Sequence, residues 1–189
     1  MSDDSFVARL NRIKDEITNH DFLKNKGLGN EVGYYIFDYV PERELEVREH
    51  IKLLKKQITN IVEFDLYEIV MDYLKDNYVL EDVFAMEEDG LETIINELQP
   101  TLGLTEDGEA NRIIDHIVNN TPDNSIVFIT GVGKVYRLVR SHTILNNLHQ
   151  KLYKVPVVMF FPGEYTGQRL KLFNAITDDN YYRAFPLCK

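Results

Sequence analysis

A short glycine-containing segment, Gly131-Val132-Gly133-Lys134, is the part of the sequence whose residue types come nearest to nucleotide chemistry. It follows an apolar run, as a phosphate-binding loop follows a buried strand. The P-loop pattern G-x-x-x-x-G-K-S/T fails twice, because Phe128 occupies the first glycine slot and Val135 replaces the magnesium-binding hydroxyl. The dinucleotide pattern G-x-G-x-x-G fails at Tyr136. We therefore predict no ATP hydrolysis by the isolated protein. The turn is either an anion site built from backbone amides or a tight structural turn.

Arginine is the second residue type that offers chemistry, and the C-terminal third holds Arg137, Arg140 and Arg183 among aromatic residues. A guanidinium can bind a carboxylate or a phosphate through two parallel hydrogen bonds. The charge is distributed unevenly, since the chain carries −10 overall, with −16 in residues 1–125 and +6 in residues 126–189. The basic third therefore either binds an anion or a partner, or pairs with the chain's own carboxylates.

The histidines, serines and single cysteine predict neither metal chemistry nor nucleophilic catalysis. His142 and His149 are seven positions apart and could share a helix face, but no third zinc ligand is evident near them. Ser141 and His142 are adjacent, so their side chains do not face each other as a nucleophile and its base must. Ser141 is instead predicted to cap a helix. Cys188 is the only cysteine, which excludes an internal disulfide. We predict no catalytic residue, no metal and no cofactor.

The strands that would position these residues are marked by β-branched, aromatic and continuous apolar runs. Three segments are predicted to share one mainly parallel sheet, namely residues 34–40, 125–130 and 155–161. Pro162 and Gly163 are predicted to end the third of these strands. Residues 62–66 predict a short strand or a strand that leads into a helix, and residues 181–187 are a last strand candidate.

Strands alternating with helical patterns indicate an α/β fold with helices on both faces of the sheet. The predicted architecture is a three-layer, P-loop or Rossmann-like arrangement without a functional P-loop. The apolar pattern of residues 67–122 is helical throughout and predicts a helical insertion on the sheet. The whole chain, residues 1–189, is predicted to form a single domain. No apolar run approaches the roughly 18 residues that cross a bilayer. The acidic start lacks signal-peptide features, so a cytoplasmic protein without a membrane partner is expected.

In open parallel sheets, ligands bind outside the carboxyl ends of the strands. The turns that would gather at this edge contain the residues for which we predict a partner- or anion-binding role: Gly131, Gly133, Arg140, His142, Gly163, Tyr165 and Arg183. Asp38 and Tyr39 end the first strand and could join them. The hypothesis is that this cluster binds an acidic partner segment or a phosphate. The alternative is that these residues only support the sheet.

Several stretches of the chain resemble one known family. They are Phe37-Asp38-Tyr39, Glu46-Val47-Arg48, Gly131-Val132-Gly133, Arg140-Ser141-His142, the run from Pro156 to Tyr165, and Asn180-Tyr181-Tyr182-Arg183-Ala184-Phe185. Together these resemble the BrxB family of BREX phage-resistance systems. The resemblance covers nearly the whole chain and implies a role in bacterial defence against phage.

The resemblance also implies partners: the phosphatase-like protein PglZ, the large ATPase BrxC and, as a further candidate, the methyltransferase PglX. It supplies no catalytic residues to transfer. The function predicted first is a non-enzymatic interaction or adaptor subunit that binds other defence proteins. One alternative is a nucleotide- or phosphate-binding protein or enzyme that uses the Gly131–Gly133 turn. Another is a DNA-contacting subunit, against which the net charge argues, so DNA contact is expected to be indirect or weak.

Overall fold

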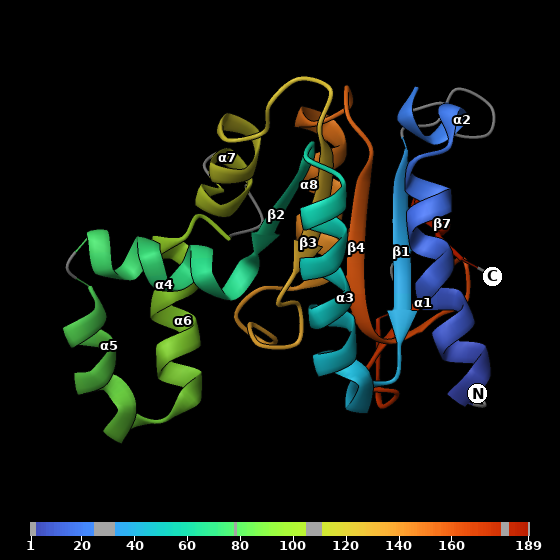
Figure 1. The fold of residues 1–189 in the computed structure, drawn as a ribbon. Helices are drawn as coiled ribbons and strands as arrows, with labels where there is room; N and C mark the ends of the chain where they lie inside the picture. Colours follow the sequence, from blue (N-terminus) through green and yellow to red (C-terminus); the bar gives the residue numbers. More distant parts are fainter. Residues whose placement is uncertain (1–2, 25–32, 78, 105–110, 179–181, 189) are drawn as a thin grey trace.

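The computed structural model describes residues 3–24, 33–77, 79–104, 111–178 and 182–188, and it has an α/β fold built around one sheet (Figure 1). Strands run parallel in the order β2–β3–β4–β1–β7. Their bounds are β1 Tyr34–Tyr39, β2 Ile61–Asp65, β3 Ile126–Thr130, β4 Val157–Tyr165 and β7 Phe185–Pro186. The three segments predicted to share a sheet are β1, β3 and β4, so that prediction is confirmed.

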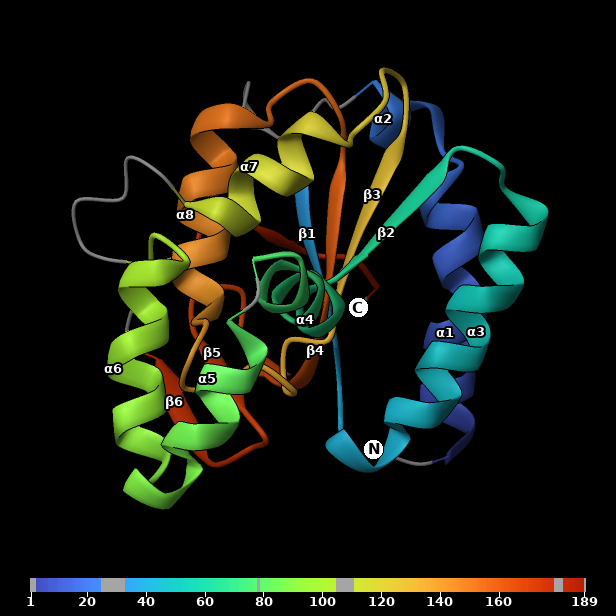
Figure 2. The ribbon, with the colours of Figure 1, turned by 90° about the vertical axis from the view of Figure 1, so that its left-hand side faces the viewer.

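Helices cover both faces of the sheet, as predicted (Figure 2). On one face lie α1 (Asp3–Ile17), α2 (His20–Leu23) and α3 (Glu44–Gln57), which follows a short 3-10 turn, η2 (Pro41–Arg43). On the other face lie α4 (Leu66–Asp76), α6 (Leu91–Thr101), α7 (Arg112–Asn119) and α8 (Ser141–Lys151). Two apolar clusters, one on each face, form the core of this three-layer arrangement.

The central strands are apolar at every position because both of their faces are covered. In β3, Val127 and Ile129 pack toward α7 and α8, whereas Ile126 and Phe128 pack toward α1 and α3, and all four are fully buried. This alternation explains why the sequence shows an uninterrupted apolar run with no polar positions between. The same reasoning applies to β4, whose first five residues are also buried.

The predicted end of β4 at Pro162 is wrong, because the strand continues to Tyr165. Pro162 is the last β4 residue that pairs with β1, opposite Tyr39. The missing proline N–H therefore falls where the parallel ladder stops. From Gly163 onward β4 pairs antiparallel with β5 (Leu170–Leu172), and β5 pairs with β6 (Ile176–Asp178). A Cβ on Gly163 would lie 2.1 Å from the carbonyl oxygen of Lys171, so this glycine permits the close approach of β5.

The predicted helical insertion of residues 67–122 is confirmed for the described residues. It contains α4, α5 (Leu80–Ala85), a 3-10 turn η3 (Met86–Asp89), α6 and α7. The prediction for residues 62–66 also holds, because β2 leads directly into α4. Asp65 caps that helix by accepting a hydrogen bond from the backbone N–H of Tyr67 at 2.9 Å. No described helix is long and apolar enough to cross a membrane.

The C-terminal segment forms less strand than the sequence predicts. Of residues 181–187, Tyr181 lies outside the described residues, and only Phe185–Pro186 forms a strand, β7, beside β1. Leu187 and Cys188 then pack into the cluster with α1 and α3. Burial raises the pKa of the Cys188 thiol to about 11, so the thiol stays protonated near neutral pH.

Candidate functional site

The Gly131–Gly133 turn lies at the carboxyl edge of the sheet, where its first glycine touches β2. Gly131 has φ +74, a left-handed conformation that favours glycine. A Cβ at this position would lie 2.1 Å from Oδ1 of Asp65. Because a carboxylate occupies the space beside the turn, any anion approaching Gly131 would meet a negative charge.

Asp65 binds the lysine of the turn. The Nζ of Lys134 lies 2.8 Å from Oδ2 of Asp65 and also sits over the ring of Tyr67, 5.1 Å from its centroid. Arg48 of α3 approaches the same oxygen at 3.3 Å. The side chain of Asp65 is 17% exposed, so it lies in a partly buried position between two cations. Sequence reasoning did not select Asp65, although an Asp directly before a helical pattern indicates a cap.

Arg48 extends this network toward the end of β1. Its Nε donates a hydrogen bond to Oε1 of Glu44 at 2.8 Å, and the hydroxyl of Tyr39 donates to Oε2 of Glu44 at 2.5 Å. Burial raises the pKa of Tyr39 well above its ordinary value, and the hydrogen bond to Glu44 raises it further. The network from Tyr39 to Lys134 thus links the ends of β1, β2 and β3 through charged hydrogen bonds.

A second aspartate, Asp38, holds the ends of β1 and β4 together. Its Oδ1 accepts a hydrogen bond from Nη2 of Arg9 at 2.6 Å, and its Oδ2 accepts from the backbone N–H of Tyr165 at 2.9 Å. Arg9 also donates to the carbonyl of Cys188 at 3.2 Å. Tyr165, a predicted binding residue, is 7% exposed, and its hydroxyl donates to the carbonyl of Ala184 at 2.7 Å. These contacts make Tyr165 a packing residue of the sheet edge.

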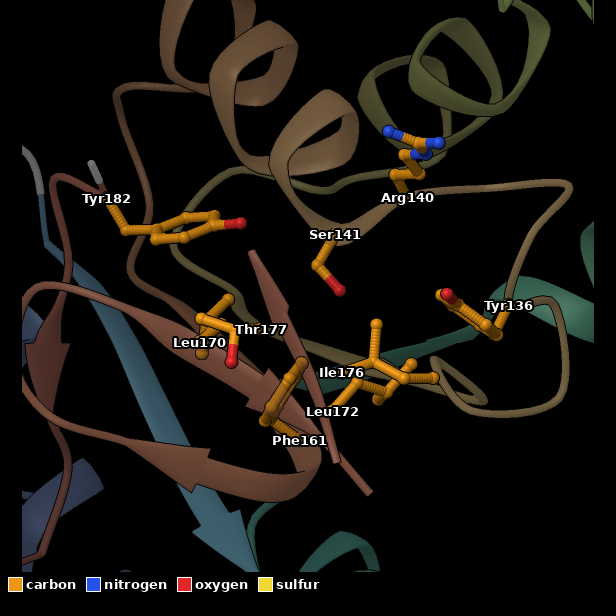
Figure 3. Close-up of a pocket in the computed structure, with 9 residues that line it drawn as sticks. All are labelled: Tyr136, Arg140, Ser141, Phe161, Leu170, Leu172, Ile176, Thr177 and Tyr182. Carbon is orange, nitrogen blue, oxygen red and sulfur yellow. The ribbon is translucent and has the colours of Figure 1, made fainter. Parts of the chain in front are cut away.

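A cavity of about 220 Å³ opens beside the first turn of α8, between this helix and the β5–β6 hairpin (Figure 3). We call it the α8 cavity. Apolar side chains form its floor: Phe161, Leu170, Leu172 and Ile176. Tyr136, Arg140, Ser141, Thr177 and Tyr182 complete its lining with polar groups. Figure 3 shows the hydroxyl groups of Tyr182 and Ser141 directed into the cavity, whereas the guanidinium of Arg140 is turned away from the apolar floor.

The structure separates the predicted site residues. Arg140 lines the α8 cavity, and His142 follows it in the first turn of α8. Arg183 is exposed between the buried Tyr182 and Ala184, and it does not line the cavity. Gly163 lies within the β4–β5 pairing, and Gly131 and Gly133 lie in the turn beside Asp65 and Phe173.

Two predictions about residues near α8 have clear outcomes. Ser141 does not cap the helix, because Arg140 occupies the cap position and no side chain makes a capping hydrogen bond there. Arg137 forms an internal ion pair, which was the alternative to a binding role, and its partner is Glu92 of α6. Arg140 differs from Arg137, since no carboxylate of the described residues pairs with it.

Among the described residues, no three His, Cys, Asp or Glu side chains are grouped to hold a metal ion.

The two glycines of the turn should differ in their tolerance of alanine. Gly131→Ala is expected to lower the free energy of unfolding by about 2 kcal/mol, because it forces a left-handed alanine against Asp65. Gly133→Ala should cost less than about 1 kcal/mol, because its Cβ meets mainly the far end of the Phe173 ring, a side chain that is 38% exposed. Urea denaturation of both variants measures the difference. Equal losses would contradict a packing role for Gly131.

Comparisons with known proteins identify related sequences. A family model described as "BREX protein BrxB" matches residues 62–187. A protein from Bacillus cereus (strain H3081.97) with the same description is 48% identical over 185 residues, which cover 95% of each chain. A third match, also described as "BREX protein BrxB", comes from Escherichia coli O9:H4 (strain HS). It is 34% identical over 193 residues, which cover 99% of this chain and 94% of the relative. No solved structure matches the chain.

Proposed function

This chain belongs to the BrxB family of BREX proteins, and on that premise we propose that it serves a BREX phage-defence system as a non-catalytic interaction subunit. Its role is to bind other proteins of the system. The candidate partners are the phosphatase-like PglZ, the large ATPase BrxC and the methyltransferase PglX. In this function the carboxyl edge of the sheet is a contact surface rather than a place of chemical turnover.

The observation that carries the proposal is the contact between the glycine turn and Asp65. A P-loop lysine binds the β- and γ-phosphates of a nucleotide, and the loop glycines leave room for them. Here the Nζ of Lys134 lies 2.8 Å from a carboxylate oxygen, and that carboxylate stands directly beside Gly131. A phosphate would have to displace Asp65 and break its bonds to Lys134, Arg48 and the first turn of α4. This supports a structural turn over the alternative of a nucleotide-binding one.

The α8 cavity is the contact site that we propose for an acidic partner segment. Its apolar floor accommodates one apolar side chain of a partner, and Arg140 at its rim offers a guanidinium that no described carboxylate neutralises. An arginine next to an apolar pocket is a frequent energetic centre of protein interfaces. A carboxylate of the partner placed at Arg140 would complete a charge-assisted hydrogen bond.

Co-purification tests the proposal. Tagged protein expressed with PglZ, BrxC and PglX is expected to capture at least one of them, and Arg140→Ala should reduce capture at least tenfold with an unchanged melting temperature. About 1.4 kcal/mol of lost contact energy gives this factor, and arginine hot spots commonly exceed it. Arg12→Ala, on the opposite face of the sheet, is the matched control and should capture as well as the original chain.

Arg183→Ala extends the same experiment to the exposed arginine beside Tyr182. Loss of capture in this variant would extend the contact surface beyond the α8 cavity, and full capture would confine the contact to the cavity. Failure of the original chain to capture any BREX protein would contradict the proposed function, and nucleotide binding by calorimetry that Lys134→Ala removes would favour the nucleotide-binding alternative.

A further inference from the structure

The helix α5 is stabilised less by packing than any neighbouring helix of the insertion. It contributes no buried residue, whereas α6 buries Ile95 and Leu98. A helix of six residues is too short to be stable alone and depends on packing of its apolar face. Yet α5 leaves Phe84 52% exposed, and Leu91 at the start of α6 is 55% exposed. The outer part of the insertion therefore presents apolar surface that the described chain leaves uncovered.

A groove runs between α5 and α6, which lie side by side on the α8 side of the sheet (Figures 1 and 2). Its volume is about 370 Å³, and its apolar lining includes Val79, Met86 and Leu98. Three carboxylates also line it, those of Asp82, Asp89 and Glu97, and all three residues are exposed. We call this the acidic groove. A methionine in such a lining adapts to side chains of different shape.

The segment that lines the acidic groove carries charge of one sign. Residues 79–104 contain seven Asp or Glu residues and no Lys, Arg or His. Glu92 pairs with Arg137, and the other six make no ion pair with any described residue. Like charges gathered on a surface repel one another, and a partner of opposite charge relieves this repulsion. The same charges repel the phosphates of a nucleic acid.

We propose that the acidic groove binds a basic amphipathic segment of a partner protein, in which apolar side chains enter the groove and Lys or Arg residues pair with its carboxylates. The inference rests on the proposed function, since it assigns a second surface to a protein that works by binding others. Charge complementarity selects the occupant, because a neutral or acidic segment would leave Asp82, Asp89 and Glu97 without counter-ions beside buried apolar surface.

Peptide binding to the full chain is the direct test. The probe is a fluorescent synthetic peptide of about 15 residues, with leucines on one helix face and lysines on the other. Its Kd is measured by anisotropy at low and moderate salt. We expect binding that weakens with salt, and a loss of at least tenfold when glutamates replace the lysines or serines replace the leucines.

Two triple variants with the same change in net charge locate the binding. Asp82→Lys, Asp89→Lys and Glu97→Lys together should weaken peptide binding at least tenfold. Asp15→Lys, Glu42→Lys and Glu68→Lys reverse exposed carboxylates outside the groove, and this control triple should leave the Kd within about twofold. Thermal denaturation checks both folds, and the neutral set Asp82→Asn, Asp89→Asn and Glu97→Gln replaces the first triple if its folding fails. Equal loss in both triples, or no binding to the original chain, would overturn the proposal.

Co-purification with the BREX proteins separates this inference from the proposed function. Peptide binding at the groove without capture of any BREX protein would refute the proposed function and leave the groove assignment standing. Capture that persists in the groove triple, together with a peptide Kd that the triple does not change, would refute the groove assignment alone.

Discussion

Replacement of Asp38 by alanine is expected to lower the free energy of unfolding by about 3 kcal/mol, the largest loss among the substitutions considered. The carboxylate accepts bonds from Arg9 at 2.6 Å and from the N–H of Tyr165 at 2.9 Å. Without it, the Arg9 side chain, which is only 13% exposed, loses its ion pair with this carboxylate, and the partly buried N–H of Tyr165 loses its hydrogen bond to it. For a chain of this length, such a loss lowers the melting temperature by roughly 6–12 °C.

Chemical denaturation and thermal melting measure this loss. Asp15→Ala is the matched control, because Asp15 is exposed on α1 and its carboxylate forms no ion pair with a described residue, so its replacement should change stability by less than about 0.5 kcal/mol. Asp38→Asn keeps one acceptor oxygen and should fall between the two. If Asp38→Ala were as stable as the control, the link between α1, β1 and β4 would contribute nothing to folding.

The second large effect is expected at Asp65, where replacement should change both stability and anion affinity. Asp65→Ala removes the cap of α4, which is worth about 1 kcal/mol. It also removes the ion pairs of Lys134 and Arg48, whose side chains are each 33% exposed, so solvent limits these to about 0.5 kcal/mol apiece. The expected total loss is about 2 kcal/mol.

Asp65→Asn separates the cap from the charge, because asparagine also caps helices but carries no charge. We expect this variant to lose only about 1 kcal/mol. It should also acquire phosphate binding at Gly131, because Lys134 would then lack its carboxylate partner and Arg48 would keep only Glu44. Inorganic phosphate is expected to raise the melting temperature of Asp65→Asn and to leave the original chain unchanged. A phosphate-dependent rise in the original chain, abolished by Lys134→Ala, would instead favour the nucleotide-binding alternative.

The central sheet follows from the sequence because its strands are buried on both faces. Such strands need apolar residues at every position, and the runs at 125–130 and 155–161 therefore identify β3 and β4 directly. The helical insertion can also be predicted from the sequence, because its apolar residues repeat at helical spacing. The failure of the P-loop pattern at Phe128 and Val135 is also a property of the sequence alone.

The short strands β5 and β6 were not predicted, and their length explains why. Each has three residues, Leu-Lys-Leu and Ile-Thr-Asp, which is too short for an alternating pattern to be distinguished from a loop. They form because β4 continues past Pro162 and offers its edge to them. Without this hairpin the α8 cavity would lack Leu170, Leu172 and Ile176, so the cavity is a product of tertiary pairing.

The sequence by itself determined the sheet, the helical insertion, the absence of a P-loop pattern and the separation of acidic and basic regions. Only the tertiary structure decided how single polar residues are used, because their partners lie far away in the chain. Asp65 meets Lys134 and Asp38 meets Tyr165 across separations of 69 and 127 residues. Local periodicity reports which face of an element is buried, but it carries no information about which strand ends become neighbours. The order of the strands in the sheet decides which strand ends are neighbours. This order places Asp65 and Asp38 where they contact residues at the ends of other strands.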